Sequence, residues 1–67
     1  MELSARNNLR GVVRSIKIGD VMAEVTVDIG GQEVVAAITS SSVQRLALKE
    51  GDQVFAVIKA TEVMIGK

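Results

Sequence analysis

The side chains of this chain with the most chemistry to offer are cations and hydroxyls. Lys59 ends the apolar run 54–58, where an ammonium group would lose hydration. A desolvated lysine either becomes neutral more readily or gains an anionic partner. Arg6 precedes an expected strand, and the segment 4–7 adds a hydroxyl and free backbone N–H groups to its planar donors, which together form a plausible oxyanion cradle. Each cation also has a structural interpretation: Arg6 as a surface residue, and Lys59 as a snorkelling side chain or the ion-pair partner of Glu62.

A second set of donors lies at the expected start of a short helix. Ser40, Ser41 and Ser42 follow one another there, and a helix start offers unpaired amides beside these hydroxyls. The structural interpretation is an ordinary N-cap, for which serine is a preferred residue. Taken one at a time, neither this group nor the cations identify a site.

The composition excludes several classes of function. The chain has no Cys and no His, which excludes disulfides, thiolate metal sites, cysteine nucleophiles and a Ser-His-Asp arrangement. Neither a catalytic set nor a set of direct metal ligands is therefore predicted. Eight basic residues balance eight acidic ones, so no net charge attracts nucleic acid or membrane. Phe55 is the one aromatic residue, which leaves no stacking platform for single-stranded bases.

Length and hydropathy predict one small domain that associates with copies of itself. A chain of 67 residues gives a single domain, 1–67, that buries only about 60% of its unfolded surface. Yet 48% of the residues are hydrophobic, which predicts a homo-oligomer. No apolar run reaches the roughly 18 residues of a membrane helix, and residues 1–4 do not resemble a secretory signal. We therefore expect a cytoplasmic protein with no membrane partner.

Charge is distributed unevenly along the chain. Residues 1–18 hold four of the eight basic residues and only one acid, Glu2. A locally basic segment on a neutral protein suits a small anion better than a polyanion. The structural alternative is that these charges discourage edge-to-edge pairing of strands.

The hydropathy pattern of the first half predicts three strands joined as a meander. Residues 21–29 alternate apolar and polar side chains, which indicates a half-buried strand, and glycine-containing turns bracket it. Residues 8–18 are rich in strand formers, but the alternation fails at Gly11, where we expect a bulge or bend. Residues 33–39 form the third strand.

The second half predicts a helix and two strands. The hydroxyls from Thr39 onward predict a capped helix that ends near Gly51. Residues 53–59 are apolar on both faces and predict a strand covered on both sides. Residues 62–65 predict a short last strand. The order of three strands, one helix and two strands is typical of an all-β, OB-like five-stranded barrel.

Three segments together resemble one family. The stretches 4–11 (SARNNLRG), 38–43 (ITSSSV) and 56–65 (AVIKATEVMI) resemble the molbindins, small Mop-type proteins built from a single TOBE-like molybdate-binding domain. The resemblance covers essentially the whole chain. It implies an OB-like barrel with strands exchanged between subunits, assembled as a homohexamer that is a trimer of dimers. It also implies that molybdate or tungstate binds between subunits, with no covalent cofactor.

The resemblance also implies a set of binding residues. By matching position, the oxyanion would be contacted by Ser4, Arg6, Thr39, Ser42 and Lys59, with main-chain N–H groups around Ala5 and Ala60. The sequence departs from the family at three places. Asn8 replaces a common Gln, Ser41 stands where an acid is frequent, and Ala60 replaces a frequent Ser, so that one hydroxyl is lost.

The resulting hypothesis is reversible, non-enzymatic storage of molybdenum as its oxyanion. A tetrahedral dianion presents only acceptors, and every implied contact is a donor. Two alternatives from other classes are an OB-type nucleic-acid-binding protein and a purely structural interaction module. Binding of the molybdopterin cofactor is a third, and it is disfavoured because a flat heterocycle needs an aromatic neighbour and only Phe55 is present.

Overall fold

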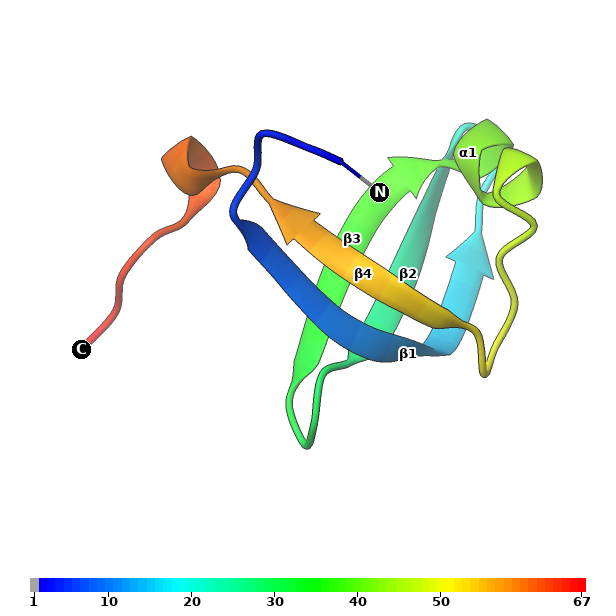
Figure 1. Cartoon of the computed structure of the whole chain (residues 1–67). Helices are drawn as coiled ribbons and strands as arrows, with labels where there is room; N and C mark the ends of the chain where they lie inside the picture. Colours follow the sequence, from blue (N-terminus) through cyan, green and yellow to red (C-terminus); the bar gives the residue numbers. More distant parts are fainter. Residues whose placement is uncertain (1) are drawn as a thin grey trace.

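The computed structural model describes residues 2–67, which fold as one curled antiparallel sheet with a short helix. The sheet order is β3-β2-β1-β4, and its strands are β1 (Asn7–Ile18), β2 (Met22–Asp28), β3 (Glu33–Thr39) and β4 (Gln53–Ile58). Helix α1 (Ser40–Arg45) follows β3, and the 3-10 helix η1 (Ala60–Glu62) follows β4. Figure 1 shows β1 and β4 crossing in front of β2 and β3, with α1 at one end. The expected all-β class with one short helix is confirmed.

Strand β1 joins the two halves of the curled sheet. Its first half pairs with β4 and its second half with β2, and Val12 takes part in both ladders, opposite Gln53 and Asp28. Because one strand serves both ladders, β4 is carried around to face β2 and β3. The antiparallel pairing of β1 with β4 places the start of β1 beside the end of β4 at one end of the molecule.

The irregularity expected at Gly11 lies elsewhere. The register of β1 against β2 shifts between Val13 and Ser15, so the bulge expected at Gly11 is wrong. Gly11 has a different role, because a Cβ atom there would lie 2.4 Å from Cγ1 of Val27 and 2.6 Å from the carbonyl oxygen of Asp28. The glycine is required by the close approach of the end of β2 across the curl.

The interior is small and aliphatic. Five residues are less than 5% exposed: Val13, Ala23, Val25, Val27 and Val43. Three of them are alternate residues of β2, as the period of two predicted, and Val43 closes one end of the sheet from α1. The strand expected over residues 21–29 is shorter than predicted, because Val21 precedes β2 and is 72% exposed.

Helix α1 begins as the sequence predicted and ends earlier. Thr39 is its N-cap, with its hydroxyl oxygen accepting from the N–H of Ser42 at 3.1 Å. The helix ends at Arg45 because Ala47 takes a left-handed conformation, with φ of 51°, and the N–H of Leu48 donates to the carbonyl of Val43. The expected end near Gly51 is therefore wrong. Among residues 2–67, no helix has the length and apolar character to cross a membrane.

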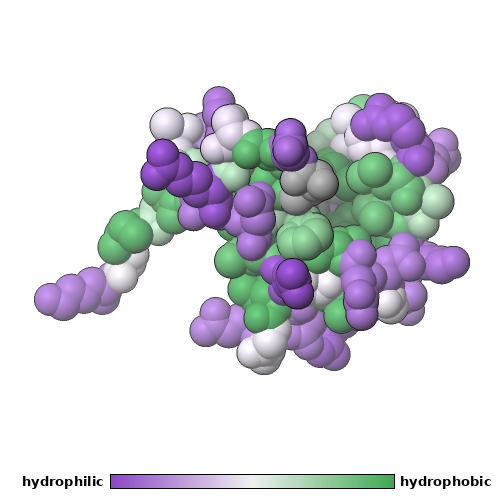
Figure 2. Space-filling model, viewed as in Figure 1, coloured by the Kyte–Doolittle hydropathy of each residue, from purple (hydrophilic) through white to green (hydrophobic). Residues whose placement is uncertain are grey.

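The second half of the predicted strand pattern differs most from the structure. Residues 62–65 were expected to form a fifth strand, but η1 occupies 60–62 and the C-terminal segment (residues 63–67) has no regular structure. Figure 1 shows this segment leaving the sheet, and Figure 2 shows its apolar middle exposed. The expectation that β4 is covered on both faces is also wrong for the single chain, since Phe55 and Val57 are 48% and 40% exposed. A strand needs a neighbouring edge to pair with, and the turn of η1 directs the chain away from β3 and β4.

Candidate functional site

One cavity brings together most of the residues that the sequence singled out. It has a volume of about 330 Å³ and lies between the segment before β1 and the turn after β4. Its lining residues are Ser4, Ala5, Arg6, Lys59, Ala60 and Thr61. We call this the cationic cavity. Five of the seven expected contact residues line it, and they come from two segments, 4–6 and 59–60, that are more than fifty positions apart in the chain.

The antiparallel pairing of β1 and β4 explains this convergence. Asn7 lies opposite Ile58, so the residues just before β1 and just after β4 must lie side by side. The side-chain amide of Asn7 also donates to the carbonyl of Ile58 at 3.1 Å. One residue on, the amide of Asn8 donates to the carbonyl of Ala5 at 3.1 Å and folds the N-terminal segment back against β1. Figure 1 shows this segment passing next to η1.

The far wall of the cavity is formed by a tight turn. The N–H of Glu62 donates to the carbonyl of Lys59 at 2.9 Å, which closes η1 immediately after β4. As a result, Lys59 and the two residues that follow it all face the same cavity. Thr61 was not among the expected contacts, because residues 60 and 61 were expected only to connect two strands, and its place in the cavity depends on the turn.

Arg6 and Lys59 are exposed, and neither forms an ion pair within residues 2–67. The ion pairs of residues 2–67 all involve Arg14, which pairs with Asp28 and Glu33. The interpretation of Lys59 as the ion-pair partner of Glu62 is therefore wrong in this structure. The desolvation expected at the end of the apolar run is also absent, because Lys59 is exposed in the single chain. The cavity thus presents two cations of like sign to solvent.

Thr39 and Ser42, the two remaining expected contacts, lie outside the cationic cavity. They belong to the start of α1, which Figure 1 shows at the opposite end of the molecule from η1. Their hydroxyls bond each other, since Oγ1 of Thr39 donates to Oγ of Ser42 at 2.7 Å. Arg45 also donates to Ser42 Oγ, at 3.3 Å. Within one chain, then, the expected contacts form two separate groups.

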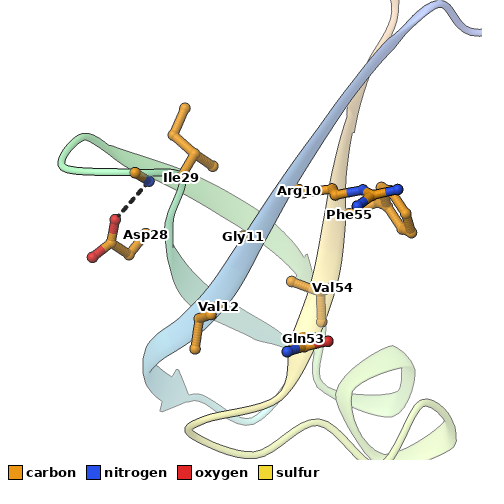
Figure 3. A pocket seen from close by; sticks show the side chains of 9 residues that line it. Arg10, Gly11, Val12, Asp28, Ile29, Gln53, Val54 and Phe55 are labelled. Atoms are coloured by element: carbon orange, nitrogen blue, oxygen red, sulfur yellow. Dashed lines mark hydrogen bonds between the residues drawn. The ribbon is translucent and has the colours of Figure 1, made fainter.

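A larger cavity of about 590 Å³ lies elsewhere and contains none of the expected contact residues. It is open and mainly apolar, and lies between the middle of β1, the start of the β2–β3 turn and β4 (Figure 3). Arg10 lies over the ring of Phe55 there, 5.9 Å from its centroid. On the other side, the carboxylate of Asp28 accepts from the N–H of Gly30 at 2.9 Å. We do not place the oxyanion here, because the lining of this cavity includes an acidic residue, Asp28, together with a single cation, Arg10.

The arginines of the basic N-terminal segment, residues 1–18, interact with different partners. Hydrogen bonds from Gly31, Arg14 and Gly30 lower the pKa of Asp28 to about 2, and the pairing with Asp28 raises the pKa of Arg14. Arg14 is thus paired with Asp28 at the start of the β2–β3 turn, and Arg10 makes a cation–π contact with Phe55. Of the arginines in residues 1–18, Arg6 alone lines the cationic cavity.

Comparisons with a family model and with known protein sequences identify related proteins. The TOBE domain model matches residues 3–65. Molybdenum-pterin-binding protein 3 of Clostridium pasteurianum is 48% identical to this chain over 66 residues, which cover 97% of each protein.

Solved structures agree with the sequence matches. A molybdate-binding protein from Sporomusa ovata superposes over the full length of both chains with a TM-score of 0.95 and 48% identity. The cytoplasmic molybdate-binding protein ModG, solved with molybdate bound, superposes with a TM-score of 0.83 and 46% identity. That match covers 90% of this chain and 43% of ModG.

Proposed function

The chain belongs to the TOBE domain family, and from that premise we propose that it binds molybdate or tungstate reversibly, without catalysing a reaction. The observation that carries this proposal is the cationic cavity, where Arg6 and Lys59 meet with no acidic residue in the lining. The names of the relatives and of the matching structures support molybdate as the ligand.

The chemistry of the lining suits a tetrahedral dianion. Arg6 offers planar, paired donors, and Lys59 acts as a compact point charge, so the two cations match a charge of minus two. Ser4 adds a hydroxyl, and the backbone N–H groups of Ala5 and Ala60 add neutral donors. In the absence of ligand the two cations repel each other, and a bound oxyanion removes that repulsion.

We further propose that each site is completed by a second copy of the chain. Thr39 and Ser42 do not line the cationic cavity, and they lie at the start of α1, which Figure 1 shows apart from η1, so a second subunit would supply them. In a homohexamer built as a trimer of dimers, α1 of one subunit would cover the cavity of another. Exclusion of water at such a boundary would strengthen every charge-assisted bond to the ligand.

Unused apolar surface and open strand edges support this assembly. Strands β3 and β4 are the two edges of the sheet, and the C-terminal segment is extended and exposed. We propose that this segment adds to the sheet of a neighbouring subunit as the fifth strand of its barrel. The exposed faces of Met22, Val35, Phe55 and Val57 would supply further contact area.

The proposed biological role is storage and homeostasis of molybdenum in the cytoplasm. Such a role needs reversible binding at many equivalent sites, which a symmetric assembly supplies. It would be excluded if the ratio of molybdate bound to protein proved negligible at micromolar molybdate.

Calorimetric titration with molybdate, tungstate and sulfate, together with native mass measurement, tests the proposal. The unmodified chain should bind molybdate or tungstate as an oligomer. Replacement of Arg6 by Gln or Lys59 by Met should each weaken binding about 10- to 100-fold, because each removes charge-assisted hydrogen bonds. Lys17→Met, which removes an exposed cation of β1 outside the cavity, is the matched control and should bind normally. Unchanged affinity in the Arg6 and Lys59 variants would refute the site and favour a purely structural role.

A further inference from the structure

Thr61 brings a hydroxyl to the wall of the cationic cavity that follows β4. The lining contains two cations, two hydroxyl residues and two alanines. Ser4 provides the hydroxyl of the N-terminal wall. On the opposite wall, Ala60 has only a methyl group, and Thr61 is the one residue besides Lys59 whose side chain can donate a hydrogen bond.

The local fold leaves this hydroxyl available. Thr61 is the middle residue of η1, which the bond from the N–H of Glu62 to the carbonyl of Lys59 closes, and it is one of the residues that line the cavity. Its side chain is exposed and, within residues 2–67, makes no hydrogen bond. The branched Cβ of threonine restricts the side chain to few rotamers, so less freedom is lost when the hydroxyl is used.

We propose that Thr61 is an oxyanion-binding residue, whose hydroxyl donates to an oxygen of the ligand held by Arg6 and Lys59. The inference rests on the proposed function, because it names a further contact at the same site. With Thr61 included, each wall of the cavity supplies one cation and one hydroxyl. A tetrahedral oxyanion, which has acceptors on all sides, can then be bound from two directions.

Three variants of the full chain, titrated with sodium molybdate, test this assignment. Thr61→Val keeps the shape of the side chain and removes the hydroxyl, and it should weaken binding about tenfold. Thr61→Ser keeps the hydroxyl and should bind within about threefold of the unmodified chain. Thr26→Val, the same substitution on β2 and outside the cavity, should leave the affinity unchanged.

A rescue experiment separates a contact from a structural effect. Ala60→Ser places a hydroxyl on the neighbouring position, so it should restore part of the affinity lost in Thr61→Val and add less to the unmodified chain. Affinity in Thr61→Val equal to that of the unmodified chain would overturn the assignment of Thr61 and leave the proposed function intact. A Thr61→Val chain that no longer assembles, by native mass, would also overturn it, because the loss would then be structural. Failure of the unmodified chain to bind molybdate would overturn both.

Discussion

The charged residues of this small protein fall into two kinds. Arg14 is satisfied within the chain by Asp28 and Glu33, and it stabilises the β2–β3 turn. Arg6 and Lys59 lie together at one cavity and have no partner among residues 2–67. Placing two like charges together lowers stability slightly, and such an arrangement is expected where an external anion supplies the missing charge.

At the scale of single residues, the lowered pKa of Asp28 predicts how the free energy of unfolding depends on pH. Its carboxylate accepts from the N–H groups of Gly31 and Gly30 and from Arg14, which together lower its pKa to about 2. Because the folded-state pKa lies below the ordinary value, the unfolded chain takes up the proton first. The stabilisation is therefore fully present above about pH 4 and is lost as the pH falls through about 2.

Asp28→Asn should accordingly unfold at lower urea concentration than the unmodified chain at pH 7, and the two midpoints should converge as the pH approaches 2. Asp20→Asn is the control, since the Asp20 carboxylate makes no hydrogen bond within the described residues. Midpoints are compared at one protein concentration. A difference between Asp28→Asn and the unmodified chain that stayed constant from pH 7 to pH 2 would contradict the assignment.

At the scale of single elements, the end of α1 contains a local conflict. Ala47 has φ of 51°, a left-handed conformation that costs an alanine about 1 to 2 kcal/mol and costs glycine little. Glycine also gains more freedom in the unfolded chain, which offsets part of that relief. Ala47→Gly should therefore raise the free energy of unfolding by about 0.5 to 1 kcal/mol, measured by urea denaturation.

A matched substitution on a strand gives the opposite sign. Ala37 lies on β3, where the extended backbone suits alanine, so Ala37→Gly should lower the free energy of unfolding by about 0.5 to 1 kcal/mol. If both substitutions destabilised the protein equally, the left-handed strain at Ala47 would not be a significant cost.

The elements that local patterns define were predictable from the sequence. The period of two located the buried side of β2, and the run of hydroxyl residues 39–42 located the start of α1, although its N-cap is Thr39 and not a serine. The end of α1 was misplaced because a glycine was expected to end the helix, whereas Ala47 takes the left-handed conformation that ends it. The bulge was misplaced because Gly11 is explained by a contact with the end of β2, which depends on the curl of the whole sheet.

Most of the residues that line the cationic cavity were predictable from the sequence, but their positions relative to one another were not. The family resemblance named Arg6 and Lys59 together, and the pairing of Asn7 with Ile58 explains why they meet. Thr61 could not be found, because its place in the cavity depends on the turn at η1, and residues 60 and 61 were expected only to connect two strands. The separation of Thr39 and Ser42 from the cavity could not be predicted either, since the sequence pattern does not give the position of α1 relative to η1.

At the scale of the whole molecule, the main feature is apolar surface without a partner. Met64 and Ile65 are 92% and 90% exposed, and among residues 2–67 only five apolar residues are less than 5% exposed. Burial of a side chain as large as isoleucine contributes about 1.5 to 3 kcal/mol, and in a symmetric assembly it does so once for every subunit. In a single chain these side chains are exposed and do not contribute this free energy of burial.

Ile65→Asp should therefore shift the assembly toward smaller species, as measured by native mass and by sedimentation at several protein concentrations. Lys67→Asp adds an acidic side chain two residues away, at an exposed polar position, and should leave the assembly unchanged. If sites are shared between subunits, molybdate affinity should fall together with assembly in Ile65→Asp. An intact oligomer in this variant would exclude the C-terminal segment from the interface.

The unpaired outer edges of β3 and β4 affect how the protein is made in the cell. A newly synthesised chain carries two rows of open amides and carbonyls along these edges, and any extended polypeptide nearby can pair with them. If copies of the chain pair through these edges as proposed, correct assembly competes with misassembly. Translation of many copies from one messenger would then favour correct assembly, because it raises the local concentration of identical chains.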